Sequence, residues 1–129
     1  MNGARWVQED VLTKHKDADL EVYAIWFSMY PMDRREAWPA DILTDSRVVN
    51  LWDERKEVGT FYAQRYGEME STVVPESTDW QGTPILWDAY LVYGPDARWE
   101  DSPTGLRRWG RTILKTQDGL RQSVDNLLR

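Results

Sequence analysis

The chain has 129 residues, of which 41% are apolar and 29% are charged, which is the size and composition of a single globular domain. Its formal charge is −6, and an acidic protein repels phosphate backbones, which argues against general nucleic-acid binding. Because the chain contains no cysteine, disulfides, thiolate nucleophiles, cysteine-rich zinc sites and iron–sulfur ligation by cysteine are excluded.

Charged and aromatic residues are unevenly used. Residues 1–97 carry 9 basic and 18 acidic side chains, whereas residues 98–129 carry 7 basic and 4 acidic ones. The 8 Trp and 6 Tyr, against 2 Phe, either fill a core under a small sheet or line a groove or interface. Charges recur through residues 1–20, and no segment approaches ~20 apolar residues, so we expect no signal peptide, no membrane span and a cytoplasmic protein.

The first third of the chain predicts a helix, a strand and a second helix. Residues 4–15 have apolar positions at helical intervals, and residues 1–19 form the expected N-terminal helical segment. Residues 20–28, LEVYAIWFS, alternate and then become continuously apolar, as in a central strand covered on both faces. After Pro31, the run MDRREAWPADIL contains helix formers, and Pro39 should end or kink a helix near Trp38.

Residues 45–67 have two interpretations. In the first, Arg47–Trp52 is a β-branched strand, and Asp53 caps a helix in which Val58, Phe61, Tyr62 and Tyr66 share a face. In the second, a single helix runs from Ser46 to Tyr66. We favour the strand followed by the helix.

The remaining chain predicts a loop, two strands and a last helix. Residues 67–83 have the Gly, Pro, Ser and Thr content of a loop. A strand from Pro84 to Tyr93 then reaches a Gly-Pro-Asp turn, and LRRWGRTIL reads as an edge strand. Thr116 is the expected cap of a final helix whose apolar stripe contains Leu120, Val124, Leu127 and Leu128.

The element order and two motifs resemble the thioredoxin fold. In thioredoxins an apolar strand runs into a C-G-P-C turn at the start of a helix, and here the expected strand runs into Met29-Tyr30-Pro31-Met32. Proline keeps the third place, and methionine stands in both cysteine places. The segment WGRTILKTQDGLRQSVDNLL is similar to the thioredoxin close of strand, short turn and amphipathic helix.

The resemblance covers roughly residues 20–129 and implies an α/β fold. It implies a single domain, 1–129, built as a three-layer α/β/α sandwich around a mixed central sheet of about four strands. Pro84 stands where thioredoxins have a cis-proline facing the dithiol, although the run from Pro84 to Gly94 is about two residues longer than the family pattern, which allows a bulge.

The dithiol chemistry of thioredoxins is excluded for this chain. Thiol–disulfide exchange needs a thiolate that attacks sulfur and a second thiol that resolves the mixed disulfide. A thioether has no proton to lose, and methionine sulfoxide needs a separate reductase for its repair. The sequence therefore predicts a redox-inactive member of the fold.

No metal or cofactor is predicted. Soft thioethers such as Met29 and Met32 can bind Cu(I), but two of them without cysteine or a nearby histidine make a poor site, and gap-filling in an aromatic core is favoured. His15 is the only histidine, which argues against a histidine-based zinc site. Ser28 could be a nucleophile in principle, but no base is visible for it.

Asp88 and the LRRWGR segment are the polar site candidates. Asp88 has almost exclusively apolar and aromatic neighbours in sequence, so it is either a perturbed acid at a site or the partner of Arg98, Arg107 or Arg108 on a neighbouring strand. The arginines of LRRWGR either hold a carboxylate or small anion or belong to a solvated strand face. The structural alternative is favoured in both cases.

The leading functional hypothesis is a thioredoxin-like binding module that holds a protein or peptide in an aromatic groove near Met29–Met32 and Pro84–Tyr93. The alternatives are a non-thiol enzyme, with Asp88 as acid or base and Arg98 or Arg108 as anion holder, and a structural subunit that buries its tryptophans in a homodimer. No nucleic-acid or membrane partner is expected. The candidate site residues are Trp26, Met29, Tyr30, Pro31, Met32, Pro84, Trp87, Asp88 and Arg108.

Overall fold

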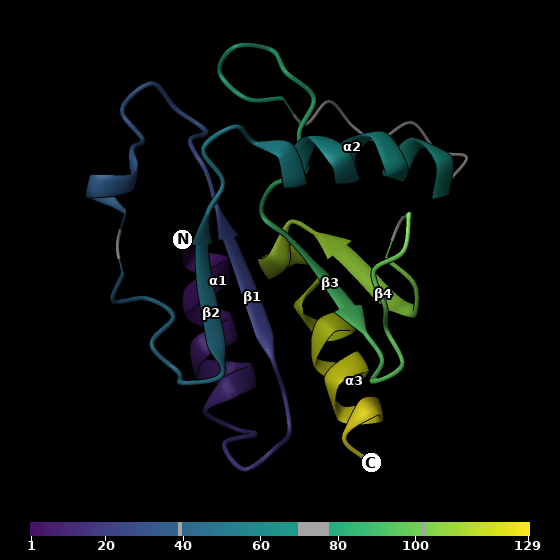
Figure 1. Cartoon of the computed structure of the whole chain (residues 1–129). Helices are drawn as coiled ribbons and strands as arrows, with labels where there is room; N and C mark the ends of the chain where they lie inside the picture. The colour runs from purple at the N-terminus through teal and green to yellow at the C-terminus, as the bar shows by residue number, and fades with distance from the viewer. Residues whose placement is uncertain (39, 70–77, 102) are drawn as a thin grey trace. The chain divides into compact units, whose positions relative to one another are not determined.

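The computed structural model describes residues 1–38, 40–69, 78–101 and 103–129, and it confirms a mixed α/β protein (Figure 1). Contacts divide the chain into two compact units, and each is described by itself. Unit 1 comprises Met1–Asp19 and Asp88–Arg129, and unit 2 comprises Leu20–Trp87.

Unit 2 is built on a parallel pair of strands. β1 (Val22–Trp26) pairs with β2 (Val48–Trp52) in a register that joins Val22 to Val48 and Trp26 to Trp52. A strand within residues 20–28 is therefore confirmed, as is the strand interpretation of residues 47–52. The expectation that the first strand is covered on both faces is wrong, because Tyr23 of β1 is 58% exposed. Val48 and Val49 favour this extended backbone because β-branched side chains pack well on a pleated surface.

An aspartate carboxylate binds backbone N–H groups on each side of β2, one just before the strand and one at the start of the next helix. Before β2, the Asp45 carboxylate accepts hydrogen bonds from the Arg47 backbone N–H and guanidinium, at 2.8–2.9 Å, and these bonds lower the pKa of Asp45 to about 2. After β2, Asp53 accepts from the N–H groups of Glu57 (3.0 Å) and Val58 (2.8 Å) at the start of α2 (Glu57–Met69). The predicted Asp53 cap is confirmed.

The predicted helix after Pro31 is wrong. Arg34 is extended (φ −152°, ψ 157°), and only the one-turn 3-10 helix η2 (Arg35–Ala37) follows. The Asp33 carboxylate binds backwards, to the N–H groups of Met29 and Tyr30, and therefore does not cap a helix ahead of it. Trp38 is extended because a residue before proline avoids the helical region, and Pro39 itself lies outside the described residues.

The predicted loop at residues 67–83 begins later than expected. α2 continues to Met69, so residues 67–69 are helical. Residues 70–77 lie outside the described part of the chain. From residue 78 onward the loop is confirmed, with an isolated bridge between Thr78 and Pro84.

Unit 1 contains the antiparallel pair of strands and the terminal helices. α1 (Asn2–Trp6) continues as the π-helix η1 (Val7–Leu12), which confirms a helical N-terminal segment. β3 (Ala89–Tyr93) pairs with β4 (Leu106–Arg111), with an irregularity between Val92 and Tyr93. η3 (Ile113–Lys115) and α3 (Gln117–Leu127) follow.

Two details of unit 1 differ from the sequence prediction. The strand expected from Pro84 begins only at Ala89, because Asp88 has a left-handed backbone (φ +48°) that cannot continue an extended strand. Thr116 occupies the N-cap position of α3, but its hydroxyl donates to the Thr112 carbonyl (3.0 Å) and does not cap the helix. Leu120 and Val124 of the predicted apolar stripe are buried.

The four strands do not form the predicted single sheet. In the described residues β1 pairs only with β2 and β3 only with β4, which gives two sheets of two strands. The three-layer sandwich around one central sheet is therefore not the observed architecture. The peptide bond before Pro84 is trans, as are all others in the described ranges, so Pro84 does not supply the cis-proline that the resemblance implies.

Each unit has its own apolar core. Ile42, Leu43, Ile85 and Leu86 are buried in unit 2, and Val11, Leu12, Tyr90, Leu120 and Val124 are buried in unit 1. In unit 2 the core requires a glycine in α2, because a methyl group at Gly59 would lie 2.5 Å from Ile85 Cγ1. The Leu86 N–H also donates to the Gly59 carbonyl (2.9 Å). This close approach holds the chain before Trp87 against α2.

Substitution Gly59→Ala should lower the free energy of unfolding by roughly 1–3 kcal/mol, because the added methyl overpacks the core against Ile85. The matched control is Gly119→Ala in α3, where the three atoms nearest to the added methyl all belong to the exposed Arg108 side chain, which can move. The control should be neutral or more stable, since alanine favours helices by about 1 kcal/mol over glycine. Urea denaturation measures both, and a Gly59→Ala protein as stable as the control would contradict the packing.

Candidate functional site

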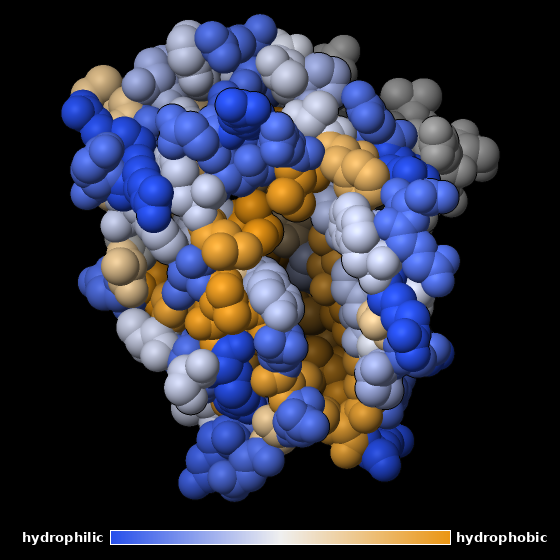
Figure 2. Space-filling model, in the orientation of Figure 1, coloured by the Kyte–Doolittle hydropathy of each residue, from blue (hydrophilic) through white to orange (hydrophobic). Residues whose placement is uncertain are grey.

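A surface depression of about 500 Å³ lies within unit 2. Three segments form it: the turn and one-turn helix after β1, the connection from β2 to α2, and the loop after residue 78. Its lining residues are Ser28, Asp33, Arg34, Arg35, Glu36, Trp52, Glu54, Lys56, Trp80 and Gln81. In the space-filling view the surface around the loops at the top of unit 2 is mainly hydrophilic (Figure 2).

The first wall is a turn that its own polar groups hold together. Asp33 Oδ2 accepts hydrogen bonds from the N–H groups of Met29 (2.8 Å) and Tyr30 (2.9 Å). The Tyr30 carbonyl accepts from the Asp33 N–H (3.0 Å) and the Ser28 hydroxyl (3.1 Å). These hydrogen bonds hold the turn in place. Two residues on it, Tyr30 and Met32, are 59% and 74% exposed.

The second wall is a loop organised by Asp79. Asp79 Oδ1 accepts from the N–H groups of Gln81 and Thr83, both at 2.9 Å, and the Gly82 N–H donates to the Asp79 carbonyl (3.0 Å). Gly82 has φ +80°, a conformation that glycine adopts without steric cost. Trp80 lies on this loop and is 52% exposed.

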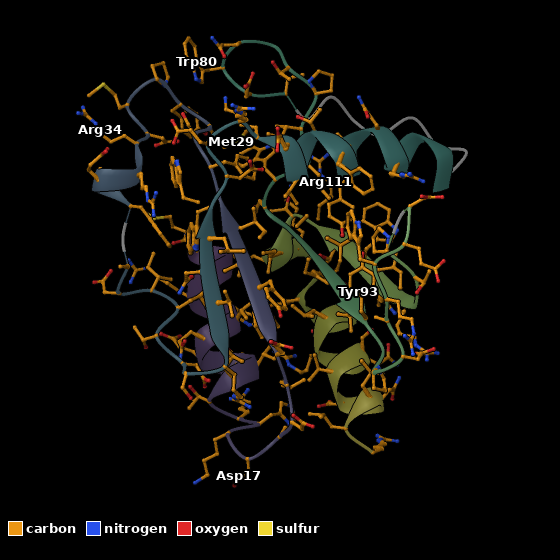
Figure 3. All side chains as sticks on the ribbon, viewed as in Figure 1. Asp17, Met29, Arg34, Trp80, Tyr93 and Arg111 are labelled. Carbon is orange, nitrogen blue, oxygen red and sulfur yellow. The ribbon has the colours of Figure 1, made fainter. Side chains whose placement is uncertain are left out.

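One backbone hydrogen bond joins the two walls. The Trp80 N–H donates to the Met29 carbonyl at 3.3 Å, so the loop of Asp79 lies beside the turn of Asp33. Figure 3 shows Trp80, Met29 and Arg34 on neighbouring segments of the same corner of unit 2. Exposed aromatic and thioether side chains from two distant stretches of sequence are thereby brought to one surface.

An ion pair between Lys56 and Asp79 connects the second wall to the start of α2. Lys56 Nζ donates to Asp79 Oδ2, and the Asp79 side chain is only 1% exposed. The hydrogen bond from Lys56 lowers the pKa of Asp79, the Thr83 and Gln81 N–H groups lower it further, and desolvation opposes them. Lys56 has a left-handed backbone (φ +58°), a costly conformation for a long side chain that the surrounding contacts must stabilise.

Three tryptophan rings pack one against the next beside the depression and form a tryptophan ladder. The ring centroids of Trp26 and Trp38 are 5.9 Å apart, and those of Trp38 and Trp52 are 6.4 Å apart. The Trp26 indole donates to Asn50 Oδ1 (2.9 Å), and the Trp52 indole donates to Glu54 Oε2 (2.7 Å). Trp52 lines the depression, so the ladder connects the β1–β2 pair to its surface.

The lining residues of the depression contain no serine paired with a base. Ser28 lines the depression, but its hydroxyl donates to a carbonyl and has no basic partner among the lining residues. The ammonium of Lys56 is held by the ionised Asp79 and cannot accept a proton in that state. Within the described ranges, no group of three or more His, Asp or Glu side chains is placed to hold a metal ion.

The predicted site residues fall into separate places. Met29, Tyr30, Pro31 and Met32 form the turn of the first wall, between the lining residues Ser28 and Asp33. Trp26 ends β1 in the tryptophan ladder, Pro84 is exposed beside Thr78, and Trp87 is half-buried at the end of unit 2. Asp88 and Arg108 belong to unit 1.

Asp88 does not form the predicted arginine pair. Its carboxylate makes no hydrogen bond or ion pair with any residue that the structure describes, and its Oδ1 lies close to Gly3. Arg107 instead pairs with Asp96 (3.2 Å), and the Arg108 guanidinium lies against Gly119. The left-handed backbone of Asp88 turns the chain just before β3 and accounts for the difference.

Sequence reasoning did not identify Lys56, Asp79 or Trp80 as site residues. A signal for the loop was present in the segment DWQG, since aspartate at the first and glycine at the fourth position is typical of a type I turn. No sequence signal pairs Asp79 with Lys56, because the two residues are 23 positions apart and meet only through the fold.

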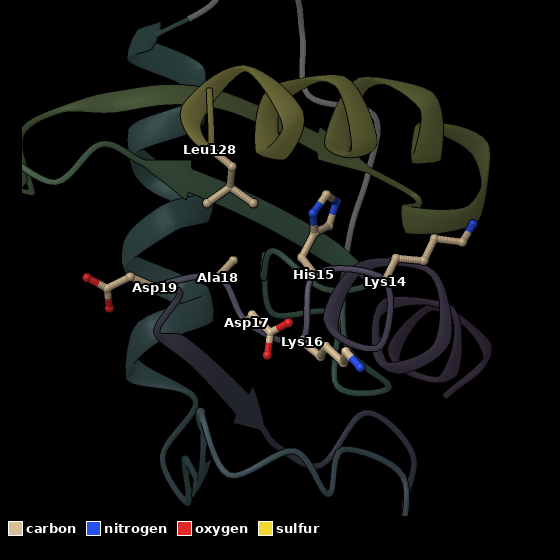
Figure 4. A pocket seen from close by; sticks show the side chains of 7 residues that line it. All are labelled: Lys14, His15, Lys16, Asp17, Ala18, Asp19 and Leu128. Carbon is tan, nitrogen blue, oxygen red and sulfur yellow. The ribbon is translucent and has the colours of Figure 1, made fainter.

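A second depression, of about 450 Å³, lies in unit 1 beside the loop after η1. Figure 4 shows its lining residues, with His15 and Leu128 above the loop that carries Asp17. His15 Nε2 lies 3.1 Å from Asp125, which joins this loop to α3, and Lys14 pairs with Asp10 at 2.7 Å. These polar groups therefore serve contacts within unit 1.

Comparison with known proteins finds no matching family model, no matching curated protein and no matching solved structure. In the described ranges, no helix combines the length and apolar character needed to cross a membrane. The functional argument therefore depends on the geometry of the site.

Substitution Asp79→Asn should lower the stability of the protein in a pH-dependent way. Asp79 has a lowered pKa when folded and an ordinary value of about 3.9 when unfolded, so the unfolded state binds protons first as the pH falls. The stabilisation that the Asp79 charge gives to the folded state is complete above about pH 4. It is lost as the pH falls through the pKa of Asp79 in the folded protein.

Urea midpoints measured from pH 7 to pH 3 test this. The urea midpoint of the wild-type protein should exceed that of Asp79→Asn most at neutral pH, and the difference between the two midpoints should narrow below about pH 4. A difference that stays constant across the whole range would show that the Asp79 charge does not stabilise the loop.

Proposed function

We propose that the chain is a binding module that recognises a protein partner at the unit 2 depression and performs no thiol chemistry. The observation that carries this proposal is the hydrogen bond from the Trp80 N–H to the Met29 carbonyl. It brings Trp80 to the turn that exposes Tyr30 and Met32. Tryptophan, tyrosine and arginine dominate the energetics of protein interfaces, and methionine is enriched there.

The preorganisation of both walls supports binding. Asp33 satisfies the N–H groups of Met29 and Tyr30, and Asp79 satisfies those of Gln81 and Thr83. A surface whose loops are already ordered loses less conformational entropy when a partner binds. The exposed side chains of Tyr30, Met32 and Trp80 are then available for contact with a partner.

The thioredoxin resemblance enters this proposal in a limited form. Its support is local: β4, η3 and α3 follow one another as the strand, short turn and amphipathic helix of the thioredoxin close. The turn at Met29–Met32 follows β1 at the predicted place, although without the helix. The binding proposal itself depends on the geometry of unit 2 alone.

The two alternative functions have less support. Neither of the two depressions described above is lined by Asp88, Arg98 or Arg108, so no concave site is described around the proposed acid or base. A homodimer that buries tryptophans stays a prediction that sedimentation would test. Trp80 and Trp99 are the tryptophans with large exposure, at 52% and 67%.

Substitution Trp80→Ala should weaken partner binding by at least about tenfold, which corresponds to roughly 1.4 kcal/mol, because truncation of an anchoring tryptophan at an interface costs more than about 1 kcal/mol. The probe is a random dodecapeptide phage library selected on the wild-type protein, from which enriched peptides are synthesised with a fluorophore. Fluorescence anisotropy then gives Kd for each variant.

Trp99→Ala is the matched control, because Trp99 is also largely exposed but lies in unit 1. The control should keep Kd within about twofold of wild type. The proposal fails if no peptide is enriched, or if the Trp80→Ala and Trp99→Ala proteins bind the enriched peptides equally well.

A further inference from the structure

We infer that the partner segment is acidic and places a carboxylate against Arg34 and Arg35 beside an apolar anchor at Trp80. This inference rests on the proposed function and specifies its ligand. It follows from which charged groups around the depression are already bonded and which remain open.

Most charged groups of the lining have partners within the chain. Asp33 accepts two backbone N–H groups, and Glu54 accepts the Trp52 indole N–H. Lys56 is paired with the nearly fully buried Asp79. Lys56 cannot bind a ligand without leaving the buried Asp79, and Asp33 and Glu54 are hydrogen-bond acceptors that offer no donor to a ligand carboxylate.

The arginines of the lining are different. Arg34 and Arg35 are exposed, and the guanidinium group of each forms no hydrogen bond or ion pair with any residue in the described ranges. Among the lining carboxylates, only that of Glu36 likewise forms no hydrogen bond or ion pair with the residues that the structure describes. The open charged donors at the depression are therefore the two guanidinium groups, beside the neutral side-chain amide of Gln81.

The chemistry of guanidinium groups selects the ligand. Arginine presents a planar fork of donors that matches a carboxylate in a bidentate arrangement. The exposed Trp80, which lines the same depression, suits an apolar or aromatic side chain of the same segment. The chain as a whole is acidic, with charge −6, and the depression also carries the carboxylates of Asp33, Glu36 and Glu54. A polyanion is therefore repelled, and the recognition rests on a single carboxylate that reaches the two open guanidinium forks.

Exposed ion pairs contribute modestly, so the expected effects are moderate. An exposed pair of good geometry changes affinity by up to roughly fivefold. Charges at the rim of an interface act mainly on the association rate and on its dependence on salt. Arg34 and Arg35 should therefore set the preference for acidic segments, while Trp80 supplies most of the affinity.

The experiment uses the dodecapeptides selected on the full-length wild-type chain. Enriched peptides should carry Asp or Glu within a few positions of an aromatic or large aliphatic residue. The double variant Arg34→Gln/Arg35→Gln should weaken binding by roughly 5- to 20-fold. The matched control Arg98→Gln, an exposed arginine of unit 1, should change Kd by less than about twofold.

A double-mutant cycle makes the assignment specific. Replacing the peptide acid by its amide should weaken binding to wild type but have little further effect on the Arg34→Gln/Arg35→Gln protein. Enriched peptides that depend on Trp80 but lack acids, or an additive cycle, would overturn the acidic ligand and leave the binding module intact. Competition by a dT12 oligonucleotide at equal concentration would also overturn it. Failure to enrich any peptide would instead overturn the proposed function.

Discussion

The surface of unit 2 depends on the ion pair between Lys56 and Asp79. Asp79 is almost completely buried, so its charge is stable there only because the Lys56 ammonium and two backbone N–H groups surround it. The pair fixes the loop of Trp80 to the residue that precedes α2. The Trp80 N–H of this loop also donates to the Met29 carbonyl. The ion pair therefore also stabilises, indirectly, the position of the turn after β1.

This constraint is the basis of the proposal that the site binds a partner. Asp33, Lys56 and Ser28 are engaged in bonds that keep the loops ordered. The side chains that remain open are aromatic, thioether and guanidinium groups together with the Glu36 carboxylate. The absence of cysteine removes the one reaction that the resemblance to thioredoxin implies.

Local signals in the sequence predicted a substantial part of the fold, whereas contacts between distant segments were not predictable. The β-branched run before Trp52 and the capping aspartate Asp53 led to the correct strand and helix. The helix after Pro31 failed because the Asp33 carboxylate binds backwards to the turn, which helix propensity does not reveal. For the candidate site, the sequence analysis singled out the turn at Met29 but not the loop beside it. That loop is bonded to the turn through the Trp80 N–H and to the start of α2 through Lys56 and Asp79, which are 23 residues apart.

The most direct test of this account is amide hydrogen exchange of the Asp79 loop in the wild-type protein, followed by NMR at neutral pH. If the ionised Asp79 organises the loop, the Gln81 and Thr83 amides that donate to its carboxylate should exchange at least about tenfold more slowly than in an unstructured peptide. The Trp80 amide, which donates to the Met29 carbonyl, should be protected with them. Exchange of all three amides at the rate of an unstructured peptide would contradict the account.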